Sequence, residues 1–342
     1  MKLEAERFTI RLRRPFRIAH GSSTTRETIL VHLHDEGEGI EAHGEGALPP
    51  YYPSTAKACL NWLNQVAQVS DTATWEKEYA ARGPGEIAAA RVALEIALQD
   101  FKAQKAGKPI WQLWGLSPAR IPSCWRTLSI ASSESELLEM LDEAISYGSG
   151  CIKLKTGSGD PGWDERCIQL AGKRPVRLGL DANEGWTTEQ AAQILLRLRG
   201  REVAFVEQPV SREAWRWQEL RSRIGEAKVP PLVADESLQT EEDFAGFRGL
   251  ADGVNVKLLK AGGLGAARMW IALARDLGLS VMVGGMIETG IGRTAAAQLA
   301  PLADWLDIDP PDSIPAAPML GFRMTGDRLM LSDRSGLGLR HV

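Results

Sequence analysis

Residues 151–183 read CIKLKTGSGDPGWDERCIQLAGKRPVRLGLDAN, and this stretch decides the fold class. Two short apolar segments, 150–157 and 176–183, flank a segment of helical character over 162–173. A strand, a helix and a second strand in roughly 30 residues predict a parallel βαβ unit, because parallel strands need a crossover connection. Each apolar segment ends in charged or polar residues, and this feature returns along the chain.

The same alternation extends in both directions from this unit. Strands are predicted at TLSIA (127–131), 150–157, 176–183, VAFVEQP (203–209), PLVADES (231–237), GVNVKLLK (253–260), SVMVGGM (280–286) and DWLDID (304–309). Helices are predicted roughly over 133–147, 162–173, 187–199, 212–224, 240–248, 264–277 and 290–301. Eight strand–helix alternations in about 190 residues predict an α/β fold of the TIM-type (β/α) barrel class.

The flanking regions have a different pattern. Strands over 3–12, 26–34 and 40–46, followed by helices near 55–68 and 85–105, predict an α+β unit with an antiparallel sheet. The segment PFRIAHGSSTT suits a mobile loop, and we expect residues 17–25 to close over a substrate. A hairpin with a Gly-Asp turn is expected in the C-terminal GFRMTGDRLMLSD. We therefore expect an α+β domain at 1–115, a barrel at 116–310, and a tail at 311–342 that returns to the first domain.

Composition excludes several classes of protein. A net charge of −4 argues against a nucleic-acid-binding surface, and no apolar run reaches the roughly 20 residues of a membrane span. The N-terminal MKLEAERFTI alternates like a strand and carries acids, unlike a signal peptide. Four widely spaced cysteines without a CxxC pair indicate reduced thiols and a cytoplasmic protein. Oligomeric state stays open, although eleven tryptophans are compatible with a homo-oligomer.

Three acids follow consecutive predicted strands. Asp181, Glu207 and Asp235 each come after an apolar run, where a carboxylate is costly unless it is paired or bound to a metal. The C-terminal ends of barrel strands carry active sites, so the three should meet there. Oxygen ligands without a nearby His or Cys favour Mg²⁺. The alternative is that each acid caps the helix that follows it.

Lysines accompany these acids. Lys153 and Lys155 lie two apart on one strand, so both should project into the barrel mouth, with Lys257 on the opposite wall. A metal and neighbouring ammonium groups would depress a lysine pKa and make a general base available. The alternative is that the lysines only pair with the acids. Lys260, on the next turn, is expected to face away.

These motifs together resemble the muconate-lactonizing subgroup of the enolase superfamily. The resemblance rests on KLK (153–155), DANE (181–184), EQP (207–209), DES (235–237) and NVKLLKAGG (255–263). It implies a modified barrel with an N-terminal α+β capping domain completed by the C-terminal tail, and Asp181, Glu207 and Asp235 as Mg²⁺ ligands. It also implies Lys155 and Lys257 as an acid/base pair, with Lys153 supporting the enolate charge. Supporting positions are expected at Asn183, Glu236 and Asn255.

One motif discriminates within the subgroup. Asp307-Ile308-Asp309 looks like the DxD motif of dipeptide epimerases, in which two acids hold the α-ammonium group of the substrate. Helix capping or surface charge beside Pro310 is the alternative. The capping segment departs from the Ala-Glu epimerases, with Ser23 and His20 where those carry basic residues, so a hydrophobic or other dipeptide is equally expected. Further substrate contacts are expected from Tyr51, Glu288 and Thr289.

The resemblance therefore implies an isomerase. The expected reaction is Mg²⁺-dependent inversion of the α-carbon of a dipeptide's C-terminal residue, by two-lysine 1,1-proton transfer through an enediolate. The alternatives are an N-acylamino acid racemase or an o-succinylbenzoate synthase, whose substrates leave Asp307 and Asp309 without a cationic partner. A non-catalytic binding barrel is a third reading, because fold alone does not prove function.

Overall fold

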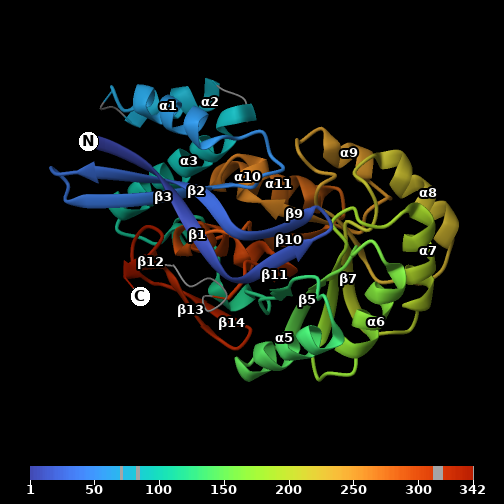
Figure 1. Cartoon of the computed structure of the whole chain (residues 1–342). Coiled ribbons are helices and arrows are strands. Elements are labelled where there is room, and N and C mark those ends of the chain that lie inside the picture. Colours follow the sequence, from blue (N-terminus) through green and yellow to red (C-terminus); the bar gives the residue numbers. More distant parts are fainter. Residues whose placement is uncertain (70–71, 82–84, 311–318, 342) are drawn as a thin grey trace.

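The computed structural model describes residues 1–69, 72–81, 85–310 and 319–341. The N-terminal region is a three-stranded antiparallel sheet in the order β1-β2-β3, covered by helices (Figure 1). Its elements are β1 (Lys2–Ile18), β2 (Gly21–Asp35), β3 (Ile40–Leu48), α1 (Ala56–Val66), α2 (Thr72–Ala81), α3 (Ala88–Lys105) and α4 (Ile110–Leu113). Helix α2 was not expected from the sequence.

Helix α3 packs directly on the sheet through a glycine–alanine contact. A Cβ atom on Gly44 would lie 1.9 Å from the Ala93 carbonyl oxygen, and one on Gly46 would lie 1.9 Å from that of Ala89. Only glycine at these two positions of β3 lets the helix backbone come this close. The seam fixes α3 on the sheet, with Glu95 toward the barrel and Asp100 toward the C-terminal tail.

The expectation of a loop over 17–25 is wrong, because two paired strands occupy most of this segment; its closure over a substrate stays a prediction. β1 continues to Ile18 and β2 begins at Gly21, with Arg17 opposite Ser22 in the ladder. Backbone pairing satisfies the polar groups of this segment, and Gly21 supplies the positive φ of 129° at the turn. Arg17 also fixes the hairpin on the barrel, since its Nε donates to the Ile130 carbonyl at 2.9 Å.

The barrel confirms the expected alternation. Its eight parallel strands are β4 (Arg126–Leu128), β5 (Cys151–Lys155), β6 (Arg177–Asp181), β7 (Val203–Glu207), β8 (Leu232–Ala234), β9 (Gly253–Lys257), β10 (Ser280–Gly284) and β11 (Trp305–Asp307), paired in sequence order. The main outer helices are α5 (Glu134–Ser146), α6 (Pro161–Ala171), α7 (Thr188–Arg197), α8 (Ala214–Ile224), α9 (Asp243–Phe247), α11 (Leu264–Asp276) and α12 (Gly290–Ala297). Trp125 N–H donates to the Leu306 carbonyl at 2.7 Å, which joins the last strand to the first.

An apolar layer fills the barrel beneath its charged mouth. Trp125, Cys151, Phe205, Val233 and Met282 form a separate buried cluster. The Trp125 and Phe205 rings pack edge to face at 4.8 Å between centroids. Residues two positions further along these strands lie on the same inward face. The next inward side chains of β5, β7 and the end of β8 therefore lie at the mouth. They are Lys153, Glu207 and Asp235, all of them charged.

The tail returns toward α3, as expected. Its elements are β12 (Met319–Leu320), β13 (Phe322–Thr325), β14 (Arg328–Leu331) and β15 (Arg340–His341), and β13 and β14 form the predicted hairpin. Leu337 N–H donates to Asp100 on α3 at 2.7 Å, and Ile110 N–H donates to the Gly336 carbonyl at 3.0 Å. Within the described residues, no helix is long and apolar enough to cross a membrane.

Two capping-domain glutamates hold barrel helices at their N-termini. Glu45 on β3 accepts hydrogen bonds from Thr289 N–H and Gly292 N–H of α12, both at 2.8 Å. Glu95 on α3 accepts from Leu264 N–H at 2.7 Å, at the start of α11. The first backbone N–H groups of a helix have no partner within it, and the helix dipole favours an anion there. The two domains are therefore joined by buried charge as well as by apolar contact.

Candidate active site

Three buried carboxylates lie side by side at the barrel mouth. Asp181 ends β6, Glu207 ends β7 beside it in the ladder, and Asp235 directly follows β8. All three side chains are almost completely buried. The structure thus brings together the acids predicted as metal ligands. Capping of the following helices does not account for them, since the N-cap residues of α7, α8 and α9 are Thr187, Glu213 and Glu242. Asp181 accepts from the Asn183 N–H at 3.0 Å, and the other hydrogen bonds of the three side chains run to lysines and to Asn255.

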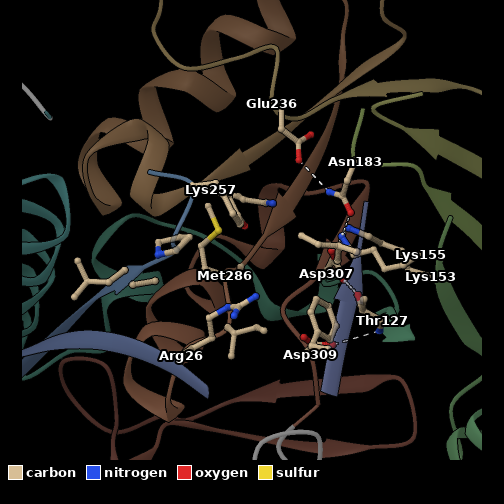
Figure 2. A pocket seen from close by; sticks show the side chains of 18 of the residues that line it. Arg26, Thr127, Lys153, Lys155, Asn183, Glu236, Lys257, Met286, Asp307 and Asp309 are labelled. Atoms are coloured by element: carbon tan, nitrogen blue, oxygen red, sulfur yellow. Dashed lines mark hydrogen bonds and ion pairs between the residues drawn. The ribbon is translucent and has the colours of Figure 1, made fainter. Parts of the chain in front are cut away.

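Lys153 and Lys155 both point into the mouth from β5, as their spacing predicts (Figure 2). The Lys153 ammonium lies 3.0 Å from Asp181 and 2.7 Å from Glu207. Lys155 donates to Asp181 at 2.6 Å and to the Asn183 side-chain oxygen at 2.8 Å. A positive charge therefore already lies between the first two carboxylates.

Two lysines approach the third carboxylate from β9 and the turn after it. Lys257 donates to Asp235 Oδ2 at 2.7 Å. The expectation that Lys260 faces away is wrong, since its ammonium lies 2.6 Å from Asp235 Oδ1 and is buried. The short helix α10 (Leu258–Ala261) turns the chain sharply after β9 and returns Lys260 to the barrel axis. The sequence signal was its place inside the quoted NVKLLKAGG motif.

Amide side chains support these charged groups from the neighbouring strands. Asn255 Nδ2 donates to Glu207 at 2.8 Å. Asn183 Nδ2 donates to Glu236 at 2.9 Å, while its oxygen accepts from Lys155. A residue that was not anticipated, Gln208, accepts from Asp235 N–H at 2.9 Å and so fixes the end of β8. Each of these contacts restrains the orientation of a carboxylate or a lysine.

The charges perturb one another strongly. Burial disfavours the charged form of Lys153, but the carboxylates of Asp181, Asp307 and Glu207 outweigh it and raise the lysine pKa well above its usual range. Burial also opposes the ammonium of Lys257, and Asp235 and Glu207 raise its pKa in the same way. Burial instead lowers the pKa of Lys260. The depressed lysine pKa expected from the sequence concerned a site that holds a metal, and it stays a prediction.

The donor set fits a hard divalent cation. Within the described ranges, no three His, Cys, Asp or Glu side chains converge on one point closely enough to ligate an ion. Instead the Lys153 ammonium lies between Asp181 and Glu207, so both carboxylates carry their charge toward one point. Burial and the charge of Asp181 both raise the pKa of Glu207, because two carboxylates lie close together in a site shielded from water. Oxygen ligands of this kind suit Mg²⁺.

A cavity of about 680 Å³ opens above these groups, between the capping sheet and the barrel. The barrel contributes Lys153, Lys155, Asn183, Glu236, Lys257, Thr127, Asp307 and Asp309 to its wall (Figure 2). The capping domain contributes Phe16, Ile18, Arg26, Glu27, Leu48 and Tyr51, among others. Buried lysines and a lining of both polar and apolar residues in one cavity are typical of a site for a small polar molecule.

The two acids of the DxD motif lie in different environments. Asp307 accepts from Lys153 at 2.5 Å and from Thr127 Oγ1 at 2.9 Å. Among the residues that the structure describes, Asp309 accepts a longer backbone hydrogen bond, from Thr127 N–H at 3.3 Å. Burial and the charge of Asp307 raise the pKa of Asp309. Asp309 is therefore the acid with more capacity left for a cationic group.

Several residues proposed to contact substrate lie elsewhere. Ser23 is paired in the ladder opposite Phe16, and neither it nor His20 lines the cavity. His20 approaches Glu184 at 3.4 Å instead. Glu288 and Thr289 are buried behind the cavity wall, where Thr289 caps α12 and contacts Glu45.

Arg26 takes the place that we expected for Ser23 and His20. Its guanidinium reaches the cavity from β2 (Figure 2), and burial lowers its pKa. The sequence signal was weak, because this residue lies at the boundary between the expected loop and the expected strand.

Backbone strain gathers at the same end of the barrel. Among the described residues, the non-glycine positions with positive φ are Asn183, Glu184, Gln208 and Asp309, at 42°, 67°, 37° and 51°. All of them follow the ends of β6, β7 or β11. Such conformations cost roughly 1–3 kcal/mol each and persist where the surrounding structure enforces them, commonly at functional sites.

Comparisons with known proteins agree with this geometry. Residues 136–340 match the family model "Enolase C-terminal domain-like", and residues 3–115 match "Mandelate racemase / muconate lactonizing enzyme, N-terminal domain". An L-Ala-D/L-Glu epimerase of Bacteroides thetaiotaomicron is 30% identical, over 100% of this chain and 88% of the relative.

Solved structures are similar over the full length. The L-Ala-D/L-Glu epimerase of Bacillus subtilis superposes with a TM-score of 0.89 at 27% identity, covering 100% of this chain and 99% of its own. A dipeptide epimerase of Enterococcus faecalis, complexed with Mg and L-Leu-L-Tyr, gives 0.86 at 27% identity, covering 99% of each chain. With both domains matched and the fold shared throughout, this chain belongs to the mandelate racemase / muconate lactonizing enzyme family of the enolase superfamily.

Proposed function

We propose that this protein is a Mg²⁺-dependent dipeptide epimerase that inverts the α-carbon of the C-terminal residue of its substrate. One observation carries the proposal: Lys155 on β5 and Lys257 on β9 face a single cavity from strands four apart in the barrel. Two bases on opposite walls can remove a proton from one face of a carbon and return it to the other. The similarity to proteins named dipeptide epimerases supports the choice of substrate.

Mg²⁺, held by Asp181, Glu207 and Asp235, would supply positive charge for the substrate carboxylate and for the negative charge that develops as the α-proton leaves. One lysine of the pair accepts that proton, and the other donates a proton to the opposite face, through an enediolate. The Lys153 ammonium would add positive charge beside the substrate carboxylate, where this negative charge develops. Groups placed where charge develops in the transition state contribute most to catalysis.

The remaining cavity residues position the ends of the dipeptide. We assign the α-ammonium group to the DxD acids, with Asp309 as the main contact because Asp307 already accepts from Lys153 and Thr127. We assign the side chain of the C-terminal residue to the capping wall, where Arg26 has a partly buried guanidinium. A substrate carboxylate would offset the desolvation of that guanidinium, so acidic C-terminal residues are favoured.

Four buried free thiols agree with the cytoplasm as location.

Deuterium exchange tests the reaction class. The purified protein is incubated in D₂O with Mg²⁺ and a mixed library of L,L-dipeptides, and mass gains of one dalton are read by mass spectrometry. We expect exchange at particular dipeptides, loss of exchange with EDTA, and none with a Lys155→Met/Lys257→Met double variant. Exchange confined to N-succinylamino acids, or no exchange at all, would contradict the dipeptide assignment.

Substitution at the DxD motif separates an epimerase from an N-acylamino acid racemase. Asp309→Asn tests the ammonium site more specifically than Asp307→Ala does. Asp307 also contacts Lys153, so removing its carboxylate would disturb the lysines as well. In a dipeptide epimerase, Asp309→Asn should lower kcat/KM by at least about tenfold, since a charged hydrogen bond is worth about 1.5–3 kcal/mol. An unchanged kcat/KM would remove the ammonium site from the proposal.

A further inference from the structure

A second chamber opens from the substrate cavity beside the first strand of the barrel. It spans about 820 Å³, open solvent included, between β1, the end of β4 and α5. Phe16, Thr127, Ile287 and Asp309 line both spaces, so the chamber adjoins the cavity at these four residues, a boundary that we call the passage. Asp309 therefore stands in the passage between them, next to Thr127 (Figure 2).

The chamber presents a mainly apolar surface. Its apolar wall is formed by Leu12, Pro15, Leu128, Met140, Ala144 and Tyr147. Two of the arginines around it have partners, while Arg13 is exposed at the rim. Arg14 pairs with Glu143 at 3.0 Å, both partly exposed at the rim. Arg126 donates to Ser149 at 2.7 Å and lies over the Tyr147 ring, 5.2 Å from its centroid. An apolar group entering from the passage would therefore meet carbon surface without displacing an ion pair.

The backbone of β1 is shaped to form this wall. The register of β1 with β2 shifts between Arg11 and Phe16, so the intervening residues leave the regular ladder. Bulges of this kind bend a strand and redirect its side chains, often next to a binding site. Here the displaced segment 12–15 lies against α5, and Arg14 reaches that helix through Glu143. The chamber is thus built by a local irregularity of the capping sheet.

We infer that this chamber binds the side chain of the N-terminal residue of the dipeptide and selects a large apolar one, such as Leu, Met or Phe. The inference rests on the proposed function. An ammonium group at Asp309 places the adjoining α-carbon in the passage. The cavity side of the passage is taken by the peptide bond and the C-terminal residue, so the chamber is the space left for the side chain. Burial of apolar surface then favours larger side chains.

The test measures kcat/KM by optical rotation or NMR for a series with Gly, Ala, Leu or Phe at the N-terminus and one constant C-terminal residue. We expect wild type to prefer Leu and Phe over Gly by at least about tenfold, as pockets do for added methylene groups. Ala144→Leu, which fills the chamber, should lower the Phe-to-Ala ratio about tenfold. Tyr147→Ala, at a half-exposed position, should shift the preference toward still larger side chains. Ser135→Leu adds the same bulk on an exposed part of α5 and should leave the ratio as in wild type.

The outcomes separate the two proposals. If no dipeptide is turned over, the proposed function fails and the inference fails with it. If dipeptides are turned over but the N-terminal side chain has no effect, or Ala144→Leu leaves the ratio unchanged, only the chamber assignment is overturned. Faster turnover of Gly-Ala-X or N-acetyl-Ala-X than of Ala-X would also overturn it, because the chamber would then hold an extension of the chain.

Discussion

Glu45 offers the sharpest test of how the two domains are held together. Its buried carboxylate accepts from Thr289 N–H, Thr289 Oγ1 and Gly292 N–H at 2.8, 2.5 and 2.8 Å. In Glu45→Ala these three donors lose their acceptor in a site that excludes water. An unsatisfied buried group costs roughly 1–3 kcal/mol, and breaking a buried charged contact costs about 3–5 kcal/mol in all. We expect a loss of about 3–5 kcal/mol in the free energy of unfolding.

The companion variants calibrate this value. Glu45→Gln keeps the shape and one acceptor oxygen, so about 1–2 kcal/mol should be lost. Glu41→Ala removes an exposed glutamate from the same strand and should change stability by less than about 0.5 kcal/mol. At the entropy of unfolding typical per residue, the Glu45→Ala loss corresponds to a fall in Tm of roughly 4–7 °C for this length.

Urea unfolding followed by tryptophan fluorescence, together with calorimetry, measures these differences. Both probes are needed because a two-domain chain can unfold in steps. If Glu45→Ala differs from Glu41→Ala by less than about 1 kcal/mol, the capping of α12 by the other domain is not a main source of stability. The reasoning from unsatisfied donors would then be refuted.

Three further predictions follow from the site and the capping sheet. Lys257→Ala should abolish epimerisation, by at least about 10²-fold, while Lys155 still exchanges the α-proton of one epimer in D₂O; full epimerisation would exclude the two-base scheme. Arg26→Leu should lower kcat/KM for dipeptides that end in Asp or Glu by about tenfold relative to those that end in Leu, and an equal effect on both would exclude its role in selectivity. Burial, together with the charge of His32, lowers the pKa of His43 to about 4 from 6.5, so the native state disfavours its protonation. The stability that neutral His43 contributes is complete above pH 6.5 and is lost as the pH falls toward 4, by up to about 3 kcal/mol. His43→Gln should remove this part of the pH dependence of the free energy of unfolding, and the same pH dependence in wild type and variant would contradict the prediction.

Much of the fold was predictable because it depends on local pattern. Each barrel strand is a short apolar run closed by polar residues, and each helix has its own periodicity, so both were visible without a partner. Asp181 and Lys153 were placed correctly for the same reason, since strand alternation alone puts them at the mouth of a parallel barrel.

The errors have physical causes as well. The segment 17–25 contains small polar residues and a glycine, which resemble a loop until a second strand offers its hydrogen bonds. The expectation that Lys260 faces away was wrong because the chain turns into helix α10 after β9. Helical geometry brings this side chain back toward Asp235. Ser23 was proposed and Arg26 was missed because the register of β1 with β2 determines which residue reaches the cavity.

The sequence by itself determined the class of barrel, the acids and lysines at its mouth, and the resemblance to a family with proton-transfer chemistry. These follow from periodicities of two and 3.6 residues, which act within a single element. Only the tertiary structure decided that Asp307 holds Lys153, that Arg26 faces the cavity, and that Glu45 and Glu95 cap helices of the other domain. Each of these contacts joins residues far apart in the chain. Packing and burial determine which residues meet across such a distance, and the local sequence pattern carries no information about that choice.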